Sequence, residues 1–142
     1  MLSAGGITFQ LSTHAQTSTI PRELYFSLLA YFQVRLADIE LHSHISRPPS
    51  ASSIPLISKA TFFDYVIVRH EWYLASSRCH KVEDSFVAVQ TSATPGDMWI
   101  GELCDIFSIN QAGNGLHHLG QVCWFKPLDF ETAGTIWDDL CV

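Results

Sequence analysis

Residues 101–125, with the sequence GELCDIFSINQAGNGLHHLGQVCWF, hold two apolar runs on either side of a polar, glycine-containing stretch. Asn114 and Gly115 tolerate a positive φ, which the turn of a tight β-hairpin requires, and the preceding glycine adds further freedom. We therefore predict that the two runs pair as antiparallel strands. Cys104 and Cys123 lie in these runs. We expect them to act as small apolar core side chains, because free cysteine is among the most buried residue types.

Most of the chain after residue 60 consists of runs rich in β-branched and aromatic residues. Runs of this kind are typical of strands, and Gly101 is a candidate β-bulge within one of them. Because no helical pattern separates the runs, we predict a mainly β fold, built as a small, partly open antiparallel barrel or sheet. The predicted strands are residues 61–74, 85–91, 98–109 and 117–125, with loops at 75–84 and 92–97.

The N-terminal part of the chain has a different pattern, with apolar residues at helical spacing after Pro21. Proline suits the first position of a helix, and Thr19 is a candidate side-chain cap. This helix is expected to pack over the β-rich part. The predicted elements are a strand at residues 6–11, a polar loop at 12–19 and an amphipathic helix at 21–36, with an extended reading of 34–45 as the alternative.

A segment rich in proline and serine, SRPPSASSIPL, separates these two patterns. Proline fixes φ and removes a backbone donor, and serine competes for backbone hydrogen bonds, so the segment is typical of a linker. We predict an N-terminal strand and helix segment over residues 1–45, a linker over 46–58 and a β-rich module over 59–142.

The composition is that of a globular protein, with 142 residues, 47% of them hydrophobic and 15% charged. A net charge of −6 disfavours direct nucleic-acid binding, which depends on Lys and Arg at the phosphates. The longest apolar stretch is interrupted at Arg35 and is too short to cross a membrane. Without a basic, apolar leader or a CxxC pair, we expect an intracellular protein, nuclear or cytoplasmic, with reduced thiols.

Several cysteines and histidines form a candidate metal or catalytic set, but their spacing is unlike that of known sites. Structural zinc sites usually draw two ligands from one short knuckle, which this chain lacks. A Cys79 nucleophile with His80 as its base is disfavoured, because neighbouring residues of a strand face opposite ways. We expect no cofactor, and zinc remains the alternative. The alternative set is Cys79, His80, Cys104, His117 and Cys123, and His42 with His44 is a further candidate half-site.

Aromatic residues are the stronger functional signal. Trp72 and Tyr73 are adjacent, so in a strand one of them must point away from the core. An exposed aromatic ring near the carboxylates of Glu71, Glu83 or Asp84 would attract a cationic or methylated side chain. The alternative is that the ring packs under the helix or against a neighbouring domain. The candidate binding residues are Trp72, Tyr73 and Trp99, from a wider aromatic set that also includes Tyr65, Trp124 and Trp137.

Residues 60–128 resemble the small β module near the C-terminus of large transposon-derived proteins of mushroom-forming fungi. That module is itself similar to the bromo-adjacent homology domain, a β-rich fold that mediates protein contacts in chromatin. The resemblance implies a non-catalytic accessory module, since the catalytic carboxylates of that family lie on a different domain. The matching positions are Phe86, Val87, Gly101, Leu103, Ile106, Phe107, Val122, Trp124 and Leu128.

Taken together, these patterns favour a non-catalytic binding or assembly module with a protein or peptide partner, associated with chromatin or a transposon. The first alternative is a metal-dependent or cysteine-based enzyme that uses the Cys and His residues of the β module. The second is a homo-oligomer, in which the low charge content marks a buried subunit face.

Overall fold

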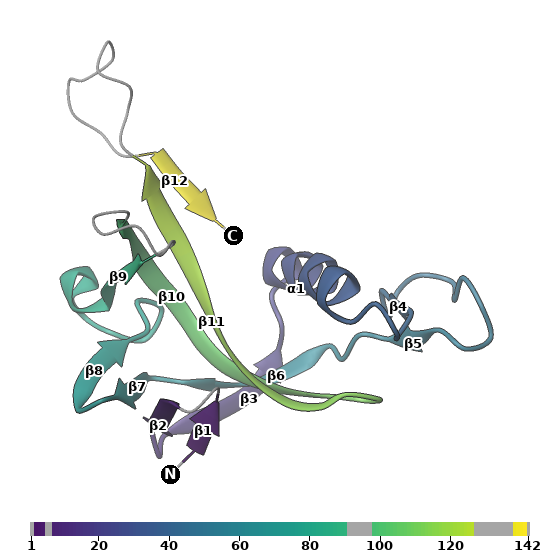
Figure 1. Cartoon of the computed structure of the whole chain (residues 1–142), viewed down its shortest axis with the longest axis horizontal. Helices are drawn as coiled ribbons and strands as arrows, with labels where there is room; N and C mark the ends of the chain where they lie inside the picture. The colour runs from purple at the N-terminus through teal and green to yellow at the C-terminus, as the bar shows by residue number, and fades with distance from the viewer. Residues whose placement is uncertain (1, 5–6, 91–97, 127–137, 142) are drawn as a thin grey trace. The chain divides into compact units, whose positions relative to one another are not determined.

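The computed structural model describes residues 2–4, 7–90, 98–126 and 138–141 (Figure 1). Within these residues the fold is mainly β with one α-helix, as predicted, and the strands form open sheets and not a closed barrel. The elements, in chain order, are β1 (Leu2–Ala4), β2 (Ile7–Leu11), β3 (Ala15–Thr19), α1 (Arg22–Arg35), β4 (Leu41–His42), β5 (Ile54–Pro55), β6 (Lys59–Phe63), β7 (Tyr65–Val68), β8 (Glu71–Leu74), the 3₁₀ helix η1 (Val82–Ser85), β9 (Phe86–Gln90), β10 (Met98–Gln111), β11 (Gly115–Lys126) and β12 (Asp138–Cys141).

The described strands form three sheets. One has the order β1-β2-β7-β8 and is antiparallel throughout. A second has the order β12-β11-β10-β6-β3, with β9 paired to β10 in antiparallel register. The third is a short parallel pair of β4 and β5. The two long strands β10 and β11 form the hairpin that the opening stretch predicts.

The chain divides into two compact units, and each unit is assembled from separate stretches of sequence. The first unit comprises residues 1–15, 63–106 and 120–142, and the second comprises 16–62 and 107–119. Both long hairpin strands therefore contribute residues to each unit. The two units alternate along the sequence, because strand pairing joins segments that are distant in it.

In the second unit, α1 buries one face against residues from β6, β10 and the segment after β5. Its buried side chains lie about one helical turn apart, as the amphipathic pattern predicts. Phe32 and Phe107 are both almost fully buried, and each such side chain contributes roughly 1.5–3 kcal/mol. The core of this unit consists of Ile20, Leu24, Tyr25, Leu28, Phe32, Leu41, Leu56, Ala60, Phe62, Phe107 and Ile109.

Two buried polar side chains connect the elements of this unit. The Tyr25 hydroxyl donates to the carbonyl oxygen of Leu56 at 2.9 Å and accepts the backbone N–H of His44 at 3.0 Å. The Gln111 side-chain oxygen accepts the N–H of Ile57 at 2.9 Å, and its NH₂ group donates to the Pro55 carbonyl oxygen at 3.2 Å. The predicted Pro/Ser linker is therefore attached to the helix and to the end of β10 by hydrogen bonds.

The first unit has its own smaller core. Ala75, Leu103 and Ile106 are buried at its centre. Partly buried side chains from β2, β6, β7, β8, β9 and β11 pack around them, as expected for a module in which non-local strands share one apolar cluster. These surrounding residues are Leu11, Phe63, Val66, Tyr73, Val87 and Val122.

The turn of the long hairpin differs in detail from the prediction. The backbone N–H of Asn114 donates to the carbonyl of Gln111 at 3.0 Å, which closes the turn. Gly113 and Gly115 take positive φ values of 83° and 86°, whereas Asn114 is absent from the residues with positive φ in the described chain. The prediction of a hairpin is confirmed, but the assignment of Asn114-Gly115 as its central pair is wrong. Glycine bears a positive φ at lower cost than asparagine.

Two further local predictions are wrong. The segment 12–19 is predicted as a polar loop but contains strand β3, which lies at the end of its sheet. Because most side chains of this edge strand are exposed and polar, its sequence is like that of a loop. Helix α1 begins after Pro21, which serves as its N-cap without a side-chain hydrogen bond, so Thr19 does not cap it. Gly101 is not a bulge in the β9–β10 ladder, since that register is regular from Met98 to Glu102.

The single strand predicted at residues 61–74 is instead three strands. The first break is at Asp64, whose backbone N–H donates to the Ser12 hydroxyl at 3.0 Å and whose carboxylate accepts from His14 at 2.8 Å. The second break is a two-residue turn at Arg69 and His70. Neither break carries glycine or proline, so the sequence pattern does not reveal it.

Candidate functional site

The hairpin of β7 and β8 carries two of the three predicted binding residues. Its register pairs Tyr65 with Leu74 and Ile67 with Trp72. Directly opposed residues share a face of a sheet, and successive residues alternate between faces. Trp72 and Tyr73 therefore lie on opposite faces, and the hairpin does not bring them into one surface.

Trp72 lies on the face that points away from the core of the first unit. Its side chain is 57% exposed, and its ring centroid is 4.5 Å from that of Tyr65. Ile67 shares this face by register, and it is paired with Gln10 of β2, an exposed polar residue. The arrangement presents an indole ring, supported by a second aromatic ring, on the outer surface of the sheet.

Tyr73 lies on the inner face, where it packs against the core cluster. Its hydroxyl donates to the Glu71 carboxylate at 2.8 Å. This hydrogen bond is the main reason that the pKa of Tyr73 is raised, with burial and the Glu71 charge adding to it and the Arg69 charge opposing it. Glu71 is thus engaged by the phenol on the face opposite Trp72, and it does not supply the carboxylate expected beside the exposed indole.

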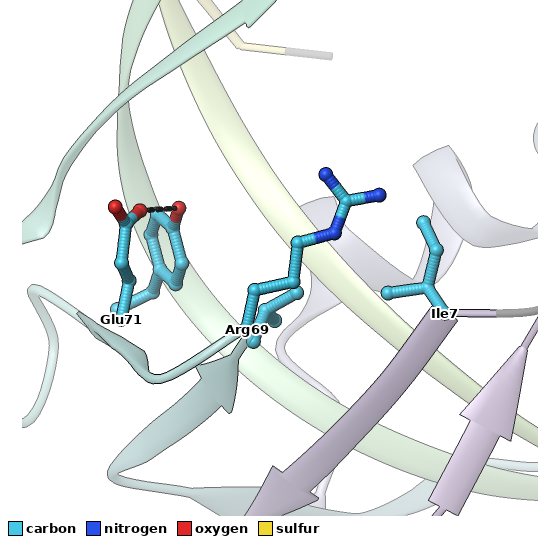
Figure 2. A pocket seen from close by; sticks show the side chains of 5 residues that line it. Ile7, Arg69 and Glu71 are labelled. Carbon is cyan, nitrogen blue, oxygen red and sulfur yellow. Dashed lines mark hydrogen bonds between the residues drawn. The ribbon is translucent and has the colours of Figure 1, made fainter.

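Figure 2 shows a pocket of about 340 Å³ at this end of the sheet, lined by Ile7, Val68, Arg69, Glu71 and Tyr73. The side chains of Ile7, Arg69 and Glu71 point in the same direction from the two strands and the turn. A guanidinium, and a carboxylate hydrogen-bonded to a phenol, therefore line the same pocket together with the apolar side chains of Ile7 and Val68. Such a set can hydrogen-bond to a group that carries both an acceptor and a donor.

The tip of this hairpin is strained. Arg69 has φ 51° and His70 has φ 70°, and they are the only described residues other than glycine with positive φ. A two-residue turn of this hand suits Asn-Gly and is costly for larger side chains, by about 1–2 kcal/mol per residue. Arg69 of this turn is also one of the residues that line the pocket.

The third predicted binding residue, Trp99, lies in β10 and forms a separate aromatic pair. It is 40% exposed, and its ring is edge-on to that of Trp124 with centroids 6.1 Å apart. Gly101, two residues further along β10, lies against β11, where an added Cβ would be 3.0 Å from the Trp124 ring. The glycine therefore allows the close approach of β11 and its tryptophan.

The candidate metal and catalytic residues do not form one site. Within the described residues, no three His, Cys, Asp or Glu side chains gather as a candidate metal group. The Cys79 thiol donates to the carbonyl oxygen of Lys81 at 3.0 Å, and the neighbouring His80 is exposed. By contrast, the sulfur atoms of Cys104 and Cys123 lie 3.0 Å apart across the long hairpin.

The other candidate histidines, His42, His44 and His117, have structural contacts in the second unit. His117 bonds to the Asn114 side chain at 2.7 Å, and its ring lies edge-on to Phe32. His42 bonds to the Ser53 hydroxyl at 2.6 Å, and the His44 ring packs edge-on to Tyr25. His42 and His44 thus have different partners, and these contacts explain both side chains without a metal ion held between them.

Some predicted features lie outside the described residues, namely Trp137, Leu128 and the loop at 92–97. Of the described helices, none has the length and apolar character to span a membrane. Sequence reasoning missed Arg69 at the pocket, and it named Tyr65 only as part of the wider aromatic set and not as the partner of Trp72. Only the strand pairing of the hairpin reveals them, because the turn lacks the usual Asn-Gly signal.

Comparison with known proteins yields no relative: no family model, curated protein or solved structure matches this chain. The resemblance to the transposon-derived β module therefore remains a prediction. The function must be inferred from the residues and geometry of the chain itself.

Proposed function

We propose that this chain is a non-catalytic binding module, and that Trp72 on the outer face of the β7–β8 hairpin is its main contact for a protein or peptide partner. The observation that supports the proposal is the exposed indole, which is 57% accessible and packs against the Tyr65 ring at a tilt of 44°, with the ring centroids 4.5 Å apart. Large exposed aromatics are rare on isolated surfaces and are enriched at contact sites.

The position of Trp72 favours binding over packing. The inner face of the same hairpin already supplies Val66 and Tyr73 to the core of the first unit. The core does not need the indole, because the side-chain alternation of a strand directs it outward. Tyr65 limits the freedom of the ring, so less conformational entropy is lost when a partner packs on it.

The charge of the chain indicates the chemistry of the partner. With 14 acidic and 8 basic residues, the protein carries a net charge of −6, which attracts basic segments from a distance. Tryptophan is also the best ring for a cation–π contact with Lys, methylated Lys or Arg, which is worth about 0.5–2 kcal/mol. A basic peptide segment is therefore the proposed ligand, as a chromatin-associated role would require.

An array of peptides that contain lysine, trimethyl-lysine or arginine tests the proposal, with glutamine-substituted copies as controls. We expect binding to the cationic peptides and about a tenfold loss with Trp72→Ala, since a contact of this kind is worth about 1.4 kcal/mol. Phe26→Ala is the matched control, because Phe26 is a 40% exposed aromatic on α1 in the other unit. Equal signals from wild type and Trp72→Ala, or no binding to any cationic peptide, would contradict the proposal.

A further inference from the structure

We propose that Cys104 and Cys123 form a reversible redox site, in which a hydroperoxide converts the two thiols into a cross-strand disulfide. Their sulfur atoms are 3.0 Å apart, and both side chains are half-buried. Both residues lie within the first unit, on the two long strands of the hairpin. The proposal is independent of the peptide-binding function proposed for Trp72.

The strands already hold the two sulfurs close to bonding distance. A disulfide bond is about 2.05 Å long, so the sulfurs need to approach by only about 1 Å, which small side-chain rotations provide. The Cys104 thiol also lies 3.5 Å from the carbonyl oxygen of Glu102, a second acceptor on its own strand. Since neither residue is fully buried, a small oxidant can reach the pair.

Cys79 provides an internal contrast within the same unit. Its thiol contacts the backbone carbonyl oxygens of Lys81 and Ser76, at 3.0 and 3.8 Å. An oxidised Cys79 would therefore lie next to carbonyl oxygens, whereas an oxidised Cys104 or Cys123 lies next to a sulfur nucleophile. In the Cys104–Cys123 pair, the second thiol can therefore attack an oxidised sulfur and form a disulfide, whereas the contacts of the Cys79 thiol among the described residues are backbone oxygens and not a second thiol.

The chemistry balances with hydrogen peroxide as the oxidant. One thiolate attacks a peroxide oxygen, so that an S–O bond forms, the O–O bond breaks and the leaving hydroxide takes a proton to become water. The second thiolate then attacks the resulting sulfenic sulfur, forming the S–S bond and releasing the oxygen as a second water. Two thiols and one peroxide give one disulfide and two waters, and a dithiol reductant reverses the oxidation.

Cys141 is the competing partner. In the β11–β12 register its backbone lies directly opposite Cys123. Directly opposed strand residues have Cα separations of about 4.5–5.5 Å, within the range that a disulfide spans. The experiment must therefore identify which two cysteines are joined, and not only count the thiols that are lost.

The full chain is first reduced, then treated with hydrogen peroxide, alkylated, and digested without reductant for peptide mass spectrometry. We expect two of the four thiols to be lost in a monomer, with the peptides of Cys104 and Cys123 linked, and dithiothreitol to restore both thiols. Cys79→Ser is the matched control and should lose two thiols as wild type does. Cys104→Ser should keep its three remaining thiols.

Four results would overturn the proposal: no loss of thiols in wild type, a link between Cys123 and Cys141, links only between chains, or oxidation that dithiothreitol does not reverse. The mapping of wild type decides the question even if a serine variant fails to fold, because it needs no substitution.

Discussion

The close approach of β11 to Gly101 makes a sharp prediction about stability. An alanine Cβ at this position would lie 2.7 Å from the backbone oxygen of Cys123 and 2.7 Å from a Val122 methyl group. It would also lie 3.0 Å from the Trp124 ring. The first of these atoms belongs to the backbone, so rotation of a side chain cannot relieve the clash, and the two strands must separate.

The expected cost of Gly101→Ala follows from these distances. Carbon atoms pack best at about 3.5–4.0 Å, so the added methyl is too close to its neighbours by roughly 1 Å. Overpacking of this kind costs about 1–3 kcal/mol. Alanine recovers about 0.5–1 kcal/mol by restricting the unfolded chain. We therefore expect a net destabilisation of about 1–2 kcal/mol.

Gly120→Ala is the matched control, on the partner strand in the same unit. There the added Cβ would lie 3.1 Å from the terminal methyl of Leu103, and the nearest backbone atom is the Asp105 oxygen at 3.8 Å. A terminal methyl moves by rotation, so the clash is cheaply relieved. We expect a change of no more than about 0.5 kcal/mol, of either sign.

Urea unfolding followed by tryptophan fluorescence measures both variants. Trp72, Trp99 and Trp124 all belong to the first unit, where both glycines lie. For an m-value of about 2 kcal/mol per molar, Gly101→Ala should lower the midpoint by about 0.5–1 M urea. If Gly101→Ala and Gly120→Ala unfold at the same urea concentration as wild type, the argument from close approach is wrong.

Two other perturbations test other parts of the structure. The double substitution Arg69→Asn, His70→Gly should raise the unfolding free energy by about 1 kcal/mol, because Asn-Gly adopts positive φ at lower cost. A urea midpoint lower than that of wild type would show that the turn is not strained. Burial, followed by the charge of His117, lowers the pKa of His118 below its ordinary 6.5. The unfolded chain then binds the proton more readily, so the unfolding free energy should fall as pH decreases through the range below 6.5, and His118→Gln should weaken this dependence. Urea midpoints of wild type and His118→Gln, measured by circular dichroism at neutral pH and at about pH 5, test this change. If the midpoints of the two proteins changed equally with pH, the prediction would be wrong.

Local patterns were sufficient where a single element controls its own conformation. The apolar spacing after Pro21 predicts helix α1 to within one residue at each end. The paired apolar runs around the glycine turn predict the β10–β11 hairpin. Adjacent Trp72 and Tyr73 predict that one ring faces outward, and the structure shows that this ring is Trp72.

Non-local contacts decided the features that the sequence predicted incorrectly. The polar segment before α1 becomes strand β3 because its partner, β6, is supplied from more than forty residues away, as the Thr17–Thr61 hydrogen bond shows. The run at residues 61–74 breaks at Asp64 because Ser12 and His14 bind that residue from a distant part of the chain. A sequence window contains neither partner, so it cannot weigh these contacts.

For this protein, the sequence alone determined the fold class, the helix, the main hairpin and the aromatic residues worth testing, since each depends on local spacing and backbone preference. Only the tertiary structure decided which aromatic ring faces outward, which turn is strained and which two cysteines meet. Those outcomes depend on strand register, where a shift of one residue turns every side chain to the opposite face.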